Sequence, residues 1–211
     1  KISSMVIKNH PIAAVILAGG RAARMEYLDK PLENLSDKPL IEWTLEALQK
    51  HAAYVIISAN HNTKKYEYLQ LPIINDIYKR YCGPLIGIYS AMVWIEANLI
   101  DPPQKLLCLP GDVPIFPSTL IHRLLDEFNY STDEVAWTEC DGQVQPLFSI
   151  WSLASKNVLK AAITRGIYGP KLAMPMLKNK LVRIERTSPL DFQNINDQDT
   201  LNYVQKTINQ L

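Results

Sequence analysis

Four short runs of apolar residues recur in the first half of the chain, and none of them alternates with polar positions. They are AAVILA (13–18), YVIISA (54–59), LPIIN (71–75) and KLLCLPGD (105–112). A β-strand can lack a polar side only where both of its faces are covered, as happens in a parallel sheet with helices on both sides. The runs therefore predict an α/β protein with three layers (α/β/α) and a mostly parallel central sheet.

The segments between and after these runs have the pattern of helices. Residues 40–51 and 118–128 repeat their apolar positions with the helical period, and residues 85–98 are strongly apolar throughout. Ser118 stands where the N-cap of the helix at 118–128 is expected. Strands that alternate with helices in this way are typical of a parallel sheet.

The pattern changes after residue 130, where two predicted strands follow one another directly. Residues 134–140 and 143–151 flank the pair Asp141-Gly142, which suits a type I′ hairpin turn. We expect this small antiparallel addition to form an edge of the sheet or a small lobe. The remaining sequence predicts helices at 153–164 and 170–179, a strand at 181–185 and a helix from Gln198. No repeat or linker divides residues 1–211, which predicts a single domain.

Charge and cysteine content limit the classes of partner. The chain has 22 basic and 21 acidic residues, a formal net charge of +1, so we expect neither a nucleic-acid partner nor a membrane surface. The three cysteines are an odd number without zinc-site spacing, which favours a reducing cytoplasm. The apolar stretch near the N-terminus is short for a signal peptide and is followed at once by Arg21 and Arg24.

The first apolar run ends at Gly19 and Gly20, and three cationic residues follow: Arg21, Arg24 and Lys30. Adjacent glycines let backbone N–H groups approach a ligand closely, and the cations would neutralise a polyphosphate. The loop is neither a P-loop nor a dinucleotide fingerprint, because the required Gly-Lys-Ser/Thr and third glycine are absent. Taken alone, the motif fits a tight turn with solvated arginines equally well.

Two aspartates follow strands that should end at the same edge of the sheet. Asp112 comes after the run at 105–110, and Asp76 comes after the run at 71–75. Ligands of open parallel sheets bind beyond the carboxyl ends of the strands, where a carboxylate can share a magnesium ion with phosphate oxygens. Either aspartate could also be an ordinary turn or capping residue. Combined with the basic glycine loop, however, they indicate a displacement reaction at phosphorus.

The sequence LAGGRAARM, followed by DK at 29–30, resembles the signature of nucleotidyltransferases, and within that group the chain is similar to the molybdenum cofactor guanylyltransferases. Further segments match this family in order and spacing. They are ISANH (57–61), INDIYKRYCGPLIGI (74–88), LCLPGDVPIFP (107–117), GQVQPLFSIW (142–151) and NINDQDTL (194–201). The resemblance covers most of residues 12–205.

This resemblance implies a Rossmann-like nucleotidyltransferase fold and an Mg²⁺-dependent enzyme. The implied reaction transfers GMP from the substrate GTP to the terminal phosphate of the substrate molybdopterin and releases pyrophosphate. Residues from about 12 to 115 would form the GTP-binding half, and residues 116 to 211 the pterin side. The resemblance also implies molybdenum-insertion proteins and molybdoenzyme chaperones as protein partners.

The resemblance assigns roles to individual residues of this chain. Contacts with the nucleotide would come from Leu17, Ala18, Gly19, Gly20, Lys30, Asn60, Asp76 and Asp112. Of these, Asn60 and Asp76 would lie near the guanine and ribose. The catalytic groups would be Arg24 and Lys30, which neutralise phosphate charge, and Asp112, which holds magnesium. Asn194 and Asn196 would lie on the pterin side.

The chain departs from the family pattern at three places. Glu26 and Tyr27 stand in the basic loop where the family usually has glycine, and a carboxylate there is unfavourable for binding GTP. On the pterin side, Gln145 replaces the histidine of a His-Pro pair, and Lys171 stands near the position of an arginine.

Three interpretations therefore remain open at the level of sequence. The first is an active guanylyltransferase. The second is a relative with another substrate, either the cytidylyltransferase of the same cofactor or a sugar-phosphate nucleotidyltransferase. The third is a carrier that binds nucleotide or pterin without catalysis, and it is motivated by Glu26.

Overall fold

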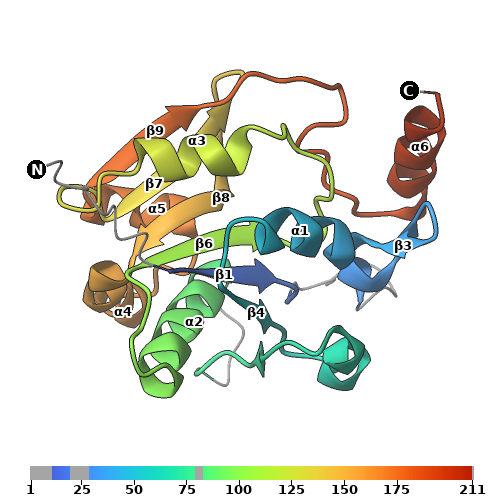
Figure 1. Cartoon of the computed structure of the whole chain (residues 1–211). Helices are drawn as coiled ribbons and strands as arrows, with labels where there is room; N and C mark the ends of the chain where they lie inside the picture. The colour runs from blue at the N-terminus through green and yellow to red at the C-terminus, as the bar shows by residue number, and fades with distance from the viewer. Residues whose placement is uncertain (1–10, 20–28, 79–82, 211) are drawn as a thin grey trace, which may run out of the picture.

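The computed structural model describes residues 11–19, 29–78 and 83–210. Within them, seven strands form one sheet in the order β5-β4-β1-β6-β8-β7-β9 (Figure 1). Their bounds are β1 Ile12–Leu17, β4 Tyr54–Ser58, β5 Ile73–Ile74, β6 Lys105–Pro110, β7 Val135–Cys140, β8 Gln143–Ser152 and β9 Asn179–Arg183. β8 runs antiparallel to both of its neighbours, and the other pairings are parallel. The predicted mostly parallel sheet is confirmed.

Helices cover both faces of this sheet, which confirms the predicted three layers. α1 (Leu40–Gln49) and α3 (Leu120–Glu127) lie on one face, and α2 (Pro84–Asn98) and α4 (Lys156–Thr164) lie on the other (Figure 1). Alternate residues of β1 belong to the two cores: Val15 packs with α2, whereas Ile16 packs with α1. A strand of this kind needs apolar residues at every position, and this is why the run at 13–18 has no polar side.

The hairpin at residues 141–142 forms as predicted but occupies a different place. Asp141 and Gly142 have φ values of 52° and 76°, as a type I′ turn requires. The expectation of an edge or a lobe is wrong, because β8 pairs with β6 inside the sheet and β9 forms the edge. Phe148 and Ile150 of β8 are almost completely buried in the core on the side of α1 and α3.

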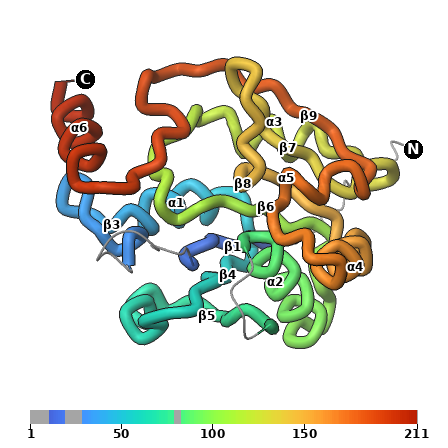
Figure 2. The backbone as a smooth tube through the Cα atoms, turned by 180° about the vertical axis from the view of Figure 1, so that it is seen from behind, coloured from blue at the N-terminus to red at the C-terminus, as the bar shows by residue number. Residues whose placement is uncertain are grey.

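A separate antiparallel sheet of two short strands lies beside the C-terminal helix. It consists of β2 (Asn34–Leu35) and β3 (Lys38–Pro39), and it packs with α6 (Gln198–Ile208) around a third apolar cluster. Figure 2 shows α6 next to β3, away from the other helices. The amide of Gln205 in α6 bonds to both the backbone N–H and the hydroxyl of Ser36 in the connecting turn.

Some predicted boundaries were wrong. α3 begins at Leu120 after Thr119, so Ser118 is not its N-cap. The helix predicted at 170–179 is only the short α5 (Pro170–Ala173), followed by the 3-10 turn η4 (Met174–Met176). The next strand therefore starts at residue 179 rather than 181. The terminal helix α6 does begin at Gln198, with the Asp197 side chain accepting the N–H of Thr200 as its N-cap.

No helix among the described residues has the length and apolar character needed to cross a membrane.

Candidate functional site

Four parallel strands have their carboxyl ends on the same side of the sheet, which we call the carboxyl edge, and the predicted site residues follow these ends. Backbone hydrogen bonds continue the sheet slightly beyond the strands: Ala18 donates to Ser58 at 2.9 Å, and Gly111 donates to Leu17 at 3.0 Å. This edge is where ligands of open α/β sheets bind. The structure therefore brings the segments after β1, β4, β5 and β6 together, as the sequence predicted.

Asn60 and Asp76 form a reciprocal pair at this edge. The Asn60 amide nitrogen donates to Asp76 Oδ2 at 2.8 Å, and the backbone N–H of Asp76 donates to Asn60 Oδ1 at 2.8 Å. Burial raises the pKa of the Asp76 carboxyl, and the hydrogen bond from Asn60 opposes that rise. The pair presents an amide and a carboxylate in fixed orientations. Such groups can form hydrogen bonds with the polar groups of a nucleoside.

Glycines allow other groups to approach this pair closely. A Cβ on Gly19 would lie 3.3 Å from the Asn60 amide nitrogen. A Cβ on Gly87, in the first turns of α2, would lie 2.8 Å from Ser58 Oγ and 3.7 Å from Asp76 Oδ1. The absence of a side chain at Gly87 lets α2 pack directly against Ser58 and Leu17, next to Asp76.

Gly87→Ala is expected to destabilise the protein although alanine is the better helix former. Helix propensity alone would favour alanine by about 1 kcal/mol. The added methyl would also lie 3.0 Å from a Leu17 methyl group, so overpacking should outweigh this gain and cost about 1–3 kcal/mol. Urea unfolding would measure the change. Ser58→Ala in the Gly87→Ala background should recover part of the loss, and a Gly87→Ala variant more stable than the parent would contradict the packing argument.

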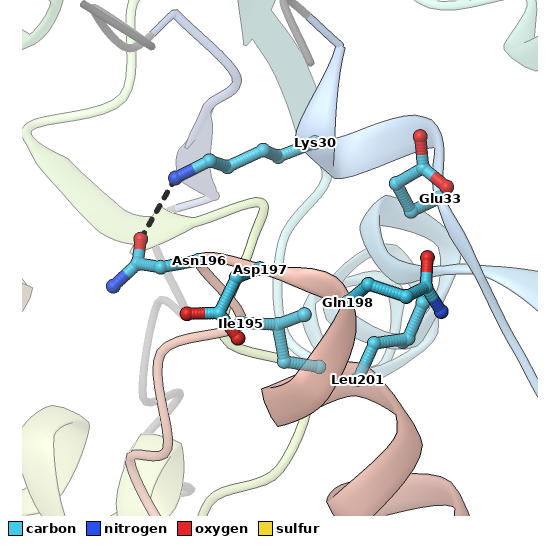
Figure 3. A pocket seen from close by; sticks show the side chains of 7 residues that line it. All are labelled: Lys30, Glu33, Ile195, Asn196, Asp197, Gln198 and Leu201. Atoms are coloured by element: carbon cyan, nitrogen blue, oxygen red, sulfur yellow. Dashed lines mark hydrogen bonds between the residues drawn. The ribbon is translucent and has the colours of Figure 1, made fainter. Parts of the chain in front are cut away.

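Lys30 is directed toward the C-terminal segment. It begins the 3-10 turn η1 (Lys30–Leu32), and its ammonium group donates to Asn196 Oδ1 at 2.8 Å (Figure 3). Both residues line a small pocket that is open to solvent. The other lining residues are Glu33, Ile195, Asp197, Gln198 and Leu201. The structure thus places a predicted phosphate-binding residue against a residue predicted for the pterin side.

Asp112 belongs to the same region. Its backbone carbonyl accepts the N–H of Ile195 at 3.2 Å, so it is tied to the segment that carries Asn196. Burial raises the pKa of the Asp112 carboxyl, while its own backbone N–H and the charge of Lys30 lower it. No group of three or more His, Cys, Asp or Glu side chains that could hold a metal ion occurs among the residues described. A magnesium ion there would need ligands from a substrate and from water, which is how Mg²⁺ is usually bound beside one or two carboxylates.

The remaining sequence predictions have different outcomes. Leu17, Ala18 and Gly19 lie at the edge formed by the strand ends. Gly20 and Arg24 lie outside the described residues, as do Glu26 and Tyr27. Asn194 is exposed and does not line the pocket with Asn196.

Sequence reasoning missed the acidic and amide side chains that line the pocket, namely Glu33, Asp197 and Gln198. Asp197 could have been recognised as the N-cap of α6, since it is an aspartate directly before the helix predicted from Gln198. Its proximity to Lys30 could not, because the two residues are far apart in the chain.

The comparisons with known proteins agree with this geometry. Residues 14–172 match the family model of the MobA-like NTP transferase domain. The chain belongs to the MobA-like NTP transferase family. A molybdenum cofactor guanylyltransferase from Shewanella woodyi is 34% identical over 155 residues, which are 74% of this chain and 76% of that protein. The protein of the same name from Cupriavidus metallidurans is 29% identical over 93% of this chain and 95% of its own length.

A solved structure confirms the fold of this MobA-like protein. Molybdopterin-guanine dinucleotide biosynthesis protein A from Archaeoglobus fulgidus superposes with a TM-score of 0.72. The match covers 95% of this chain and 100% of that one at 21% identity. The expected Rossmann-like nucleotidyltransferase fold, including an antiparallel addition, is therefore confirmed. The family match and the curated relatives identify the chain as a nucleotidyltransferase.

Proposed function

We propose that this MobA-like protein transfers GMP from GTP to the terminal phosphate of molybdopterin, with Mg²⁺ as cofactor and pyrophosphate as the second product. Residues 1–211 would act as one catalytic domain in the cytoplasm. The observation that carries the proposal is the convergence of Lys30, Asp112 and the Asn60–Asp76 pair at one edge of the sheet. The names of the relatives support guanylyl transfer in molybdenum cofactor biosynthesis.

The Asn60–Asp76 pair would bind the nucleoside. The Watson–Crick edge of guanine and the ribose hydroxyls both offer hydrogen-bond donors, which a carboxylate accepts well. Asn60 already occupies Asp76 Oδ2 and so orients the carboxylate for a second donor. Gly19 would let the nucleotide approach this pair without a side chain in the way, whereas Gly87 lets α2 pack against Ser58 beside Asp76.

Lys30, and Asp112 through a magnesium ion, would neutralise the charge of the triphosphate. The attacking oxygen belongs to the molybdopterin phosphate, so the chain needs no nucleophile of its own. The obstacles are repulsion between two anions and the charge that develops on pyrophosphate. Lys30 would neutralise phosphate oxygens, and Asp112 would hold magnesium, which supplies further neutralisation and orients the phosphates. Arg24 would act beside Lys30.

The pterin would lie toward the C-terminal segment. Asn196, beside Lys30, and Asn194 would donate and accept hydrogen bonds there. Gln145 on β8 and the exposed Lys171 on α5 would take the place of the family's histidine and arginine, and Lys171 would offer a point charge in place of the rigid fork of donors of an arginine. We also propose molybdenum-insertion proteins and molybdoenzyme chaperones as the proteins that exchange the cofactor with this chain.

Isothermal titration with GTP, CTP and ATP in the presence of Mg²⁺ tests the proposal first. GTP should bind selectively, and addition of molybdopterin should then release pyrophosphate. A preference for CTP would instead indicate the cytidylyltransferase of the same cofactor. Tight nucleotide binding without pyrophosphate release would support the carrier that Glu26 suggests. Titration without Mg²⁺ is the control for the metal.

A further inference from the structure

Asp29, the residue before Lys30, is held by two side chains from a distant segment. The amide nitrogen of Asn62 lies 2.9 Å from Oδ1 and 3.0 Å from Oδ2 of Asp29, and the ammonium group of Lys65 lies 2.5 Å from Oδ2. The Asp29 side chain is only 15% exposed. Three polar contacts on one partly buried carboxylate make this a much stronger attachment than a single surface ion pair.

The attachment fixes the backbone that carries Lys30. The Asp29 carbonyl accepts the N–H of Leu32 at 2.8 Å and so closes the turn η1. Pro31 is buried against Gly111, where an added Cβ would lie only 3.3 Å from the proline. The Lys30 backbone is therefore held on both sides, while its ammonium group reaches Asn196.

Asn62 connects this attachment to the opposite side of the site. It lies two residues after Asn60 and has a left-handed backbone, with φ 49° and ψ 35°. Asparagine tolerates this conformation better than most residues. The segment 60–62 thus bonds to Asp76 through Asn60 and to Asp29 through Asn62.

The charge of Asp29 is compensated within the same contacts. Burial alone would raise the pKa of this carboxyl, but the hydrogen bonds from Lys65 and Asn62 and the charge of Lys65 lower it overall. The carboxylate stays ionised, and the positive charge of Lys65 reduces the repulsion it would exert on a phosphate near Lys30.

We propose that Asp29, held by Asn62 and Lys65, is a positioning residue that orients Lys30 toward the triphosphate and couples it to the Asn60–Asp76 pair. This inference rests on the proposed function, because it takes Lys30 as the group that binds phosphate. Asp29 itself would not touch the nucleotide. Its effect on binding would pass through Lys30.

A double-mutant cycle on the affinity for Mg²⁺–GTP tests this coupling. Asp29→Ala should weaken binding about tenfold, the scale of a lost charge-assisted contact. In a Lys30→Met background, the same Asp29→Ala change should alter the affinity by less than about twofold, because Asp29 would affect GTP binding only through the position of Lys30. Equal losses in the two backgrounds would show that Asp29 acts independently of Lys30 and would overturn the inference.

Controls separate positioning from folding and from the function itself. Glu46→Gln removes a single, more exposed ion pair, with Lys38 at 2.8 Å, and should leave the affinity within about twofold. Lys65 is 60% exposed, so Lys65→Gln tests the same attachment if Asp29→Ala does not fold, whereas Lys65→Arg should restore binding. A parent protein that binds no nucleotide would reject the proposed function together with this inference. Additive losses in a protein that does bind GTP would reject the inference alone.

Discussion

Asp112→Ala is expected to lower the rate of guanylyl transfer by roughly 10² or more, the scale found when one preorganised charge-stabilising group is lost. Asp112 is the carboxylate placed beside Lys30 at the end of β6. The variant would lack the carboxylate that coordinates the magnesium ion beside the phosphates. Pyrophosphate release under saturating GTP and Mg²⁺ measures the effect.

The matched control is Asp126→Asn, on the exposed surface of α3, which should keep the rate within about twofold. Asp112→Asn gives a second comparison, because it keeps the size of the side chain and removes its charge. Since burial raises the pKa of Asp112 in the folded state, the folded protein binds its proton more readily than the unfolded chain, and ionisation costs stability at neutral pH. Asp112→Asn should therefore unfold at an equal or higher temperature while losing activity. An active Asp112→Asn protein would refute this role for the carboxylate.

Lys30→Met should also lower the rate by roughly 10² or more, because methionine keeps part of the side-chain length and removes the charge that would meet the phosphates. The loss should appear in GTP affinity as well as in turnover. Lys50→Met, at the exposed C-terminal end of α1, is the control and should change neither quantity by more than about twofold. A Lys30→Met protein with normal GTP affinity and turnover would show that the proposed phosphate site is wrong.

The same variant should also change the pH dependence of magnesium binding. Asp112 must be ionised to bind the metal, and the charge of Lys30 lowers its pKa against the larger effect of burial. Removing Lys30 therefore raises that pKa further. Magnesium affinity, which falls as the pH decreases through this pKa, should begin to fall at a higher pH in Lys30→Met than in the parent. A titration of Mg²⁺ binding at several pH values measures the shift, and a shift toward lower pH would contradict the assigned coupling.

The candidate site was predictable wherever its residues follow strands. Leu17, Asn60, Asp76 and Asp112 each come after or end an apolar run, and parallel strands bring such positions to one edge. The Asn62 and Lys65 contacts with Asp29 were not predictable, since they depend on the path of the turn after β4.

The sequence alone determined the class of the fold, because β1 and β6 have apolar residues at every buried position and can only be covered on both faces. It also determined the type I′ turn, since Asp141-Gly142 accepts positive φ values at both positions. Local composition controls such features, so they can be read from a short stretch of residues.

Beyond the β7–β8 hairpin, only the tertiary structure decided which strands are neighbours and which distant residues meet. An apolar strand packs equally well beside many others, so nothing local indicated that β8 would also pair with β6. Lys30 and Asn196 are 166 residues apart, and they meet because α6 packs on β2 and β3 and brings its N-terminal end to η1. Contacts of this kind depend on the combined burial of several elements, and no single stretch of the sequence contains that information.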